Sequence, residues 1–122
     1  MPRRILIVDD DKELCEELSE ILKDAGFSAD YIFDPLAGKV LLQNNVYDVL
    51  LLDIKMPRLN GFEFLKEIRD HVGRLKVFVI SGNHFLPELL EEKQLSRLVA
   101  GVLQKPFDVD VLVEKIREAT RP

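Results

Sequence analysis

Two short apolar runs, residues 5–8 and 49–52, each end directly in aspartate. They read Ile-Leu-Ile-Val and Val-Leu-Leu-Leu, so they lack the polar alternation of a strand with one solvent face. Strands buried on both faces are typical of parallel sheets that helices cover on both sides. Because parallel strands share one carboxyl edge, we expect Asp9 and Asp53 to emerge side by side there.

The residues after the first run predict an amphipathic helix. Apolar side chains recur at helical spacing through this segment, at Leu14, Leu18, Ile21, Leu22 and Ala25. Gly26 follows directly and provides a C-terminal stop, since glycine adopts the left-handed conformation without strain. These residues form the apolar stripe of the first predicted helix.

The rest of the chain continues the alternation of strands and helices. Asp34 and Asp108 precede helical patterns as candidate N-caps, and Pro35 stands at a first helical position. In chain order we predict a strand over 27–33, a helix over 35–43, a loop containing Met56, Pro57 and Gly61, a helix marked by Phe64, Leu65, Ile68 and Val72, a strand over 77–80, a helix over 87–98, a strand over 102–104 and a helix marked by Val109, Leu112, Val113 and Ile116. This alternation predicts a doubly wound α/β fold, with residues 1–122 as one domain.

Composition excludes several classes of function. The 122 residues are 47% hydrophobic, which suffices for one core, and the net charge of −5 argues against direct nucleic acid or membrane-surface binding. No apolar stretch approaches the roughly 20 residues of a membrane-spanning helix. Cys15 is the single cysteine, and the first residues do not resemble a signal peptide. We therefore expect a cytoplasmic protein.

Polar residues stand at the predicted carboxyl ends of four strands. They are Asp9, Asp10 and Asp11 after the first strand, Asp53 after the third, Ser81 after the fourth and Lys105 after the fifth. Ligands of open α/β sheets bind at this edge. Each residue also has an ordinary explanation: Asp11 as a helix cap, Ser81 as a structural cap and Lys105 as a surface lysine.

Taken together, these residues predict phosphoryl-transfer chemistry. Carboxylates gathered at one edge repel each other, and a hard divalent cation relieves that repulsion; Mg²⁺ fits, with Mn²⁺ as an alternative. Asp10 and Asp53, with help from Asp9 through water, form a sufficient set of ligands. An Asp53 oxygen can then attack phosphorus while Lys105 and Ser81 stabilise the charge on the phosphoryl oxygens.

Four segments together resemble the response-regulator receiver domains of two-component signalling systems, in particular the chemotaxis regulators. They are Ile5-Leu6-Ile7-Val8-Asp9-Asp10-Asp11, Leu51-Leu52-Asp53-Ile54-Lys55-Met56-Pro57 with Gly61, Ser81, and Lys105-Pro106-Phe107. Each segment is weak alone, but their order at successive strand ends is specific. The resemblance implies a flavodoxin-like (βα)5 fold with strand order 2-1-3-4-5.

The resemblance also assigns roles. Asp53 would be the phosphorylation site, and Asp9, Asp10 and the backbone carbonyl of Lys55 would complete a magnesium site with it. Ser81 and Lys105 would each bind a phosphoryl oxygen, and the peptide bond after the lysine is often cis in this family. The domain would not be an enzyme acting on others, but would catalyse its own phosphorylation and autodephosphorylation.

Partners follow from the same resemblance. The phosphodonor would be a sensor histidine kinase or a phosphotransfer protein, and the output a downstream protein target or an output domain outside this chain. A phosphorylation-dependent dimer would use the fourth helix, fifth strand and fifth helix. Exposed apolar residues around Phe85, Leu86, Leu89 and Leu90 mark our expected output face.

Two departures keep alternatives open. Receivers commonly carry an aromatic residue three positions before the lysine, where this chain has Val102, and the segment from Ser81 to Lys105 is about two residues longer than usual. A receiver fold used as a constitutive interaction module is therefore the main alternative. A haloacid-dehalogenase-type phosphatase needs an aspartate where Lys55 stands, and a flavin-binding module would have its phosphate repelled by the aspartates at 9–11.

Overall fold

The computed structural model describes residues 2–56, 59–68 and 75–121. Five parallel strands form its main sheet: β1 (Arg4–Val8), β2 (Ser28–Ile32), β3 (Val49–Asp53), β6 (Lys76–Ser81) and β7 (Gly101–Gln104). They lie in the order β2-β1-β3-β6-β7, which is 2-1-3-4-5 when these strands are counted along the chain. The predicted doubly wound topology is confirmed.

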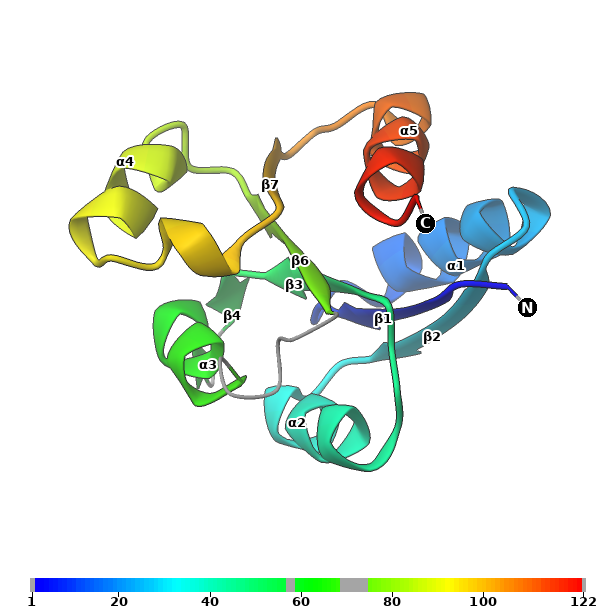
Figure 1. Ribbon diagram of the computed structural model, residues 1–122, viewed down its shortest axis with the longest axis horizontal. Coiled ribbons are helices and arrows are strands. Elements are labelled where there is room, and N and C mark those ends of the chain that lie inside the picture. Colours follow the sequence, from blue (N-terminus) through cyan, green and yellow to red (C-terminus); the bar gives the residue numbers. More distant parts are fainter. Residues whose placement is uncertain (1, 57–58, 69–74, 122) are drawn as a thin grey trace.

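Helices cover both faces of the sheet (Figure 1). One face carries α1 (Lys12–Asp24) and α5 (Val109–Ala119), and the other carries α2 (Pro35–Asn44), α3 (Gly61–Ile68) and α4 (Leu86–Glu92). Val72, predicted in the third helix, and Pro57 lie outside the described residues. No helix in the described part of the chain is long and apolar enough to cross a bilayer.

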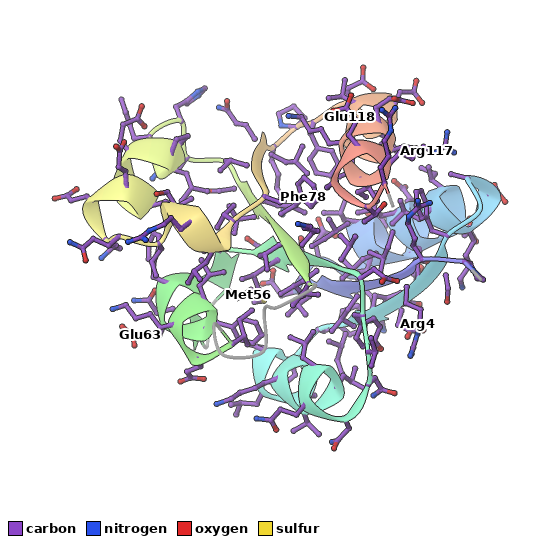
Figure 2. The ribbon with its side chains drawn as sticks, viewed as in Figure 1. Arg4, Met56, Glu63, Phe78, Arg117 and Glu118 are labelled. Atoms are coloured by element: carbon purple, nitrogen blue, oxygen red, sulfur yellow. The ribbon has the colours of Figure 1, made fainter. Side chains whose placement is uncertain are left out.

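Strand residues alternate between two apolar cores, one on each face of the sheet. Leu50 and Leu52 pack on the α3 side, whereas Val49 and Leu51 pack on the α1 side, and all four are fully buried. Figure 2 shows Phe78 of β6 between the sheet and α5, in the second of these cores. Burial on both faces explains why these strands read as continuous apolar runs.

The predicted helix caps are confirmed. An oxygen of Asp11 accepts a hydrogen bond from the Leu14 backbone N–H at 3.1 Å, so Asp11 is the N-cap of α1. Asp34 accepts from the Leu36 N–H at 3.0 Å at the start of α2. Asp108 caps α5 in the same way. Each carboxylate satisfies a donor that the first helical turn leaves unpaired.

The buried face of α1 differs from the predicted stripe. The residues it buries are Cys15, Leu18, Ser19 and Leu22, spaced as i, i+3, i+4 and i+7. Ile21, which belongs to the predicted apolar stripe, lies on the flank of this buried face and is 39% exposed. Ser19 occupies a core position that apolarity alone would not assign to it.

The predicted helix over 87–98 is wrong in its length. The helix α4 ends at Glu92, and a short 3₁₀ turn, η2 (Ser96–Leu98), follows. Gln94 has φ +60°, and the Leu95 N–H donates to the Leu90 carbonyl at 2.7 Å, which closes the helix in a Schellman motif. Gly26, with φ +97°, ends α1 in the same way, but Gln94 offers no comparable sequence signal.

The predicted apolar output face is also corrected. Leu86 and Leu90 are 1% and 2% exposed because they pack in the core beneath α4. Leu89 is half-buried, and Phe85 alone among these four predicted residues is a large exposed side chain. The period of α4 therefore places only part of this apolar cluster at the surface.

A short antiparallel hairpin occupies the segment predicted as a loop after β3. It consists of β4 (Lys55–Met56) and β5 (Leu59–Asn60), and Lys55 pairs with Asn60. Gly61 follows at the start of α3, where a β-carbon would lie 2.5 Å from the Ile54 carbonyl oxygen. Only glycine permits this close approach, which brings the hairpin against the end of β3.

Candidate functional site

Three aspartates meet at the carboxyl edge of the sheet. Asp9 follows β1 and Asp53 ends β3, and these strands are neighbours that pair Val8 with Leu52. One carboxylate oxygen from each of Asp9, Asp10 and Asp53 lies within 4.8 Å of the others. Asp9 and Asp53 are buried, whereas Asp10 is exposed. The predicted acidic cluster is thus present and consists of Asp9, Asp10 and Asp53, whereas Asp11 caps α1.

Lys105 joins this cluster from the end of β7. Its Nζ lies 3.2 Å from Asp9 Oδ2 and 3.7 Å from Asp53 Oδ2. Its backbone N–H donates to the Ser81 carbonyl at 2.8 Å, which ties the lysine to the neighbouring strand. The peptide bond between Lys105 and Pro106 is cis, an isomer that the sequence alone leaves undecided.

Burial controls the electrostatics of the site. It raises the pKa of Asp53 to about 6, with a further contribution from Asp9, while the Lys55 backbone N–H at 3.0 Å and Lys105 act in the opposite direction. Partial burial lowers the pKa of Lys105, but Asp9 and Asp53 outweigh it, so the pKa lies above its usual value. The Lys105 ammonium therefore lies beside two buried carboxylates, and the exposed Asp10 carboxylate is close to both of them.

This donor set fits a divalent cation. Carboxylate oxygens are the ligands that hard cations prefer, and three of them lie close enough together to share one ion. An ion with two positive charges would also offset the negative charge that Lys105 leaves unbalanced. Asp9, Asp10 and Asp53 are the residues that could hold it.

Ser81 and Lys55 lie beside the acidic cluster. Ser81 is buried at the end of β6, where Ile80 pairs with Asp53, and its Oγ accepts a hydrogen bond from the Asn83 N–H at 3.0 Å. Lys55 begins β4, and its side chain is exposed. The structure therefore brings all the predicted site residues to one edge of the sheet.

Comparison with known proteins identifies this arrangement. The model of the response regulator receiver domain family matches residues 5–117. The chain belongs to this family. It is a receiver domain of two-component response regulators, and receiver domains bind a divalent metal at the acidic pocket that Asp9, Asp10 and Asp53 form here.

Curated relatives support the assignment. The response regulator MprA of Mycobacterium sp. (strain KMS) is 33% identical over 124 residues, which cover 99% of this chain and 52% of that protein. The transcriptional regulatory protein DltR of Streptococcus agalactiae (strain NEM316) is 30% identical over 118 residues, with 97% and 52% covered. The chain thus spans about half the length of these relatives.

Solved structures share the fold over nearly their whole length. The chemotaxis response regulator CheY4 of Vibrio cholerae superposes with a TM-score of 0.85 at 26% identity, covering 98% of this chain and 99% of that one. The response regulator TrrA of Thermotoga maritima, in complex with Mg(2+)-BeF, has a TM-score of 0.82 at 27% identity, with 96% and 98% covered. The receiver domain of this chain is therefore similar to both.

The region around Val102 departs from the usual receiver pattern. Val102 is half-buried and packs against the core on the α4 side of the sheet. Two residues further on, the Gln104 side-chain amide contacts the imidazole of His84 in the loop after β6. Both side chains are exposed. A valine and a polar contact therefore occupy the region where receivers commonly carry an aromatic residue.

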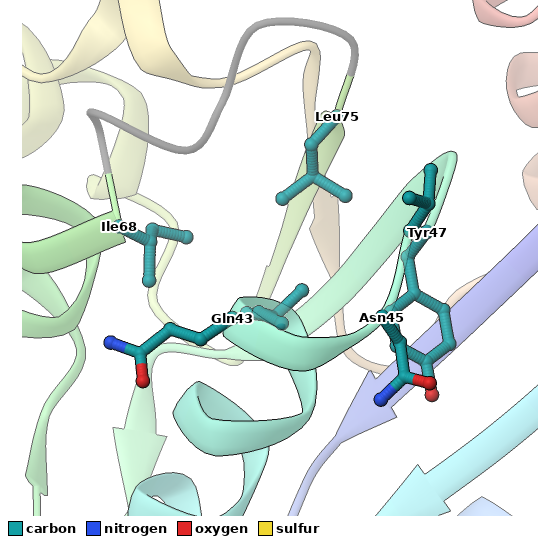
Figure 3. Close-up of a pocket in the computed structure, with 7 residues that line it drawn as sticks. Gln43, Asn45, Tyr47, Ile68 and Leu75 are labelled. Carbon is teal, nitrogen blue, oxygen red and sulfur yellow. The ribbon is translucent and has the colours of Figure 1, made fainter.

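Two surface pockets differ in their relation to the site. The pocket in Figure 3, lined by Gln43, Tyr47 and Leu75 among others, lies near the amino ends of β3 and β6, and none of the described residues in its lining is acidic. The second, which we call the α3–α4 pocket, is lined by Phe62 and Leu89 and reaches Ser81. The sequence did not single out this second pocket, because its walls come from two separate helices.

Proposed function

We propose that this receiver accepts a phosphoryl group on Asp53 from a phosphohistidine of a sensor histidine kinase or a phosphotransfer protein. The observation that carries the proposal is a buried Asp53 carboxylate flanked by two further aspartates and by the Lys105 ammonium at 3.7 Å. The reaction depends on Mg²⁺, with Mn²⁺ as an alternative. The TrrA structure in complex with Mg(2+)-BeF supports this choice.

Each residue has a defined task in the proposed reaction. An ionised oxygen of Asp53 attacks phosphorus, and Lys105 neutralises charge on a phosphoryl oxygen. The Ser81 oxygen already accepts a hydrogen bond from Asn83, so its hydroxyl hydrogen is free to be donated to a second phosphoryl oxygen. The domain therefore carries the groups for its own phosphorylation and, with water as the attacking group, for dephosphorylation.

The metal would be held by Asp9, Asp10, Asp53 and the backbone carbonyl of Lys55. When bound, it would supply positive charge to the phosphoryl oxygens and reduce repulsion between the incoming phosphate and the acidic cluster. The residues of the chain do the positioning: Asp9 is held by the Asp11 N–H at 2.9 Å, and Asp53 by the Lys55 N–H at 3.0 Å.

Phosphorylation is proposed to change protein contacts in the cytoplasm. A phosphoryl group on Asp53 carries about −1.5 to −2 charges and three further acceptor oxygens where the carboxylate carried −1, and this change next to Ser81 and Lys105 can reposition the loops that carry them. We treat residues 1–122 as one receiver domain whose output is a protein target or a segment outside this chain. The proposed dimer forms through α4, β7 and α5.

One observation favours a second candidate function. Val102 replaces the common aromatic residue and packs in the core, so the usual rotating side chain is absent at this position. A constitutive interaction module, phosphorylated weakly or not at all, would retain the fold and the acidic cluster. The two candidates differ in whether Asp53 becomes phosphorylated.

Intact-mass spectrometry after incubation with Mg²⁺ and acetyl phosphate tests the proposal. We expect a phosphoryl adduct that disappears in Asp53→Asn and in a sample without magnesium. Circular dichroism of the variant checks that it is folded. A folded wild-type protein that binds Mg²⁺ and yet gains no adduct, from acetyl phosphate or from a phosphohistidine protein, would favour the constitutive module.

A further inference from the structure

A short anchored turn connects α4 to the amino end of β7. It lies in the segment that is longer than in common receivers. The left-handed Gln94 ends α4, and η2 follows, drawn in gold between α4 and β7 in Figure 1. Leu95 is buried, and Leu98 and Val99 pack against the core on the α3 side of the sheet. The turn is therefore fixed to the body of the domain.

This turn forms one wall of a pocket that we call the β6–η2 pocket. The pocket has a volume of about 230 Å³, and its lining combines Lys76 of β6 with Arg97, Leu98 and Val99 of the turn. Lys76 begins β6 and Ser81 ends it, so the length of the strand, about 16 Å, separates the pocket from the phosphoacceptor site. The two sites lie at opposite edges of the sheet.

Two basic side chains dominate the charge of the described lining. Lys76 and Arg97 are exposed, and no described residue of the lining is acidic. Among the residues that the structure describes, neither side chain forms an ion pair. Asp48 precedes the neighbouring strand β3, but its carboxylate accepts a hydrogen bond from the Arg4 N–H of β1 at 2.8 Å, on the side of β3 away from β6. An anion in the pocket would relieve the repulsion between the two cations.

The two cations match the charge of a phosphate group. A guanidinium binds two phosphate oxygens through parallel N–H donors, and an ammonium adds a compact positive charge with rotatable donors. A phosphate monoester carries about −1.5 to −2 charges near neutral pH, whereas a carboxylate carries −1. Leu98 and Val99 offer apolar contact to a small organic group on the ester. We propose that the β6–η2 pocket binds a small phosphate monoester, with the phosphate oxygens on Arg97 and Lys76.

Binding there should strengthen the junction between β6 and the turn. The Ala100 N–H donates to the Val77 carbonyl at 2.7 Å, and both residues line the pocket, so this bond already links the chain after η2 to β6. A phosphate held by Arg97 and Lys76 bridges the same two segments. Because the ligand binds the folded protein and not the unfolded chain, it should also stabilise the fold by mass action. The site would operate whether or not Asp53 is phosphorylated.

Titration of metal-free protein with inorganic phosphate at constant ionic strength, followed by NMR, tests the site. We expect saturable shifts of the backbone amide resonances of Leu98 and Val99. Arg97→Gln and Lys76→Gln should each weaken phosphate binding by about tenfold or more, because each removes charge-assisted hydrogen bonds. Lys115→Gln, at an exposed lysine on α5, is the matched control and should bind as the wild type does. Equal affinity in all four proteins would overturn the proposal.

Two further measurements distinguish this site from general anion binding. Sodium acetate at the same ionic strength should give no saturable shifts at these amides, and acetate binding as tight as that of phosphate would contradict a phosphate site. Shifts confined to Ser81 and Asn83, or no saturable shifts at all, would also overturn the proposal. In thermal denaturation, phosphate should raise the midpoint of the wild type more than that of Arg97→Gln, whereas an equal rise would show that phosphate acts elsewhere on the protein.

Discussion

The ammonium of Lys105 lies closer to Asp9 than to Asp53. Its Nζ is 3.2 Å from Asp9 Oδ2, within hydrogen-bonding distance, and 3.7 Å from Asp53 Oδ2. The lysine thus neutralises a proposed metal ligand and the proposed phosphoacceptor at the same time. Asp9 is fully buried, and its carboxylate is held by this contact and by the Asp11 N–H.

Replacing Lys105 should have opposite effects on metal affinity and on the rate of phosphoryl transfer. In Lys105→Met the carboxylates lose a positive neighbour, so Mg²⁺ should bind about threefold to tenfold more tightly, as calorimetric titration would measure. Phosphorylation should nevertheless slow, because one phosphoryl oxygen loses its cation. Lys115→Met, an exposed site on α5, is the matched control. Equal metal affinity in both variants would show that Lys105 does not compete with the metal.

The metal-free domain should gain stability when Asp53 becomes neutral. Burial raises the pKa of Asp53 to about 6 from 3.8, so the folded protein holds this proton more tightly than the unfolded chain. The stability that the group contributes is complete below about pH 4 and is lost as the pH rises through about 6. An uncharged amide at this position avoids that loss, so Asp53→Asn should be more stable by about 1–3 kcal/mol near pH 7.5.

Urea denaturation of the wild type and Asp53→Asn without metal, across pH 4 to pH 8, measures this difference. The gain should shrink steadily below about pH 6 and disappear near pH 4. A variant with the same pH dependence as the wild type would contradict the raised pKa. Added Mg²⁺ should reverse the order, because the ion binds the aspartate and stabilises the folded wild type.

Glycine should be the favoured residue at the ends of both α1 and α4. Gln94 adopts φ +60° at the end of α4, a conformation that costs a non-glycine residue about 1 kcal/mol. Gln94→Gly should therefore stabilise the protein by about 0.5–1 kcal/mol, whereas Gly26→Ala should destabilise it by a similar amount. Denaturant midpoints test both. Destabilisation by Gln94→Gly would mean that the flexibility gained by the unfolded chain outweighs the relief of strain.

Gly61 should tolerate no side chain. A β-carbon there would lie 2.5 Å from the Ile54 carbonyl oxygen, so Gly61→Ala must push the β4–β5 hairpin away from β3. We expect a loss of about 1–3 kcal/mol and weaker Mg²⁺ binding, because Lys55 lies in the displaced hairpin. Gly82→Ala, where a β-carbon meets nothing, is the control. Equal thermal stability of the two variants would contradict the close approach.

The sequence was sufficient for the architecture and for the residues of the acidic cluster. Strands that are buried on both faces require continuous apolar runs. The residue that follows such a run lies at the carboxyl edge of the sheet, whatever the position of the strand within it. The sequence alone is therefore enough to place Asp53 beside Asp9. The cap residues Asp34 and Asp108 were equally predictable, because an N-cap depends only on its own helical turn.

Tertiary structure decided what depends on packing between distant segments. Local periodicity does not identify the distant neighbours that set a residue's conformation and exposure. Such neighbours determine the left-handed backbone conformation of Gln94, the exposure of Ile21 and the burial of Leu86 and Leu90. The β4–β5 hairpin depends on the close approach of Gly61 to Ile54, the residue after β3.

The same holds at the site. The sequence by itself determined which groups reach the edge of the sheet, because strand ends are local features. Only the fold decided that Lys105 binds Asp9 more closely than Asp53, and that α3 and α4 leave a pocket beside Ser81, since both depend on how the last strand and two helices pack across the sheet.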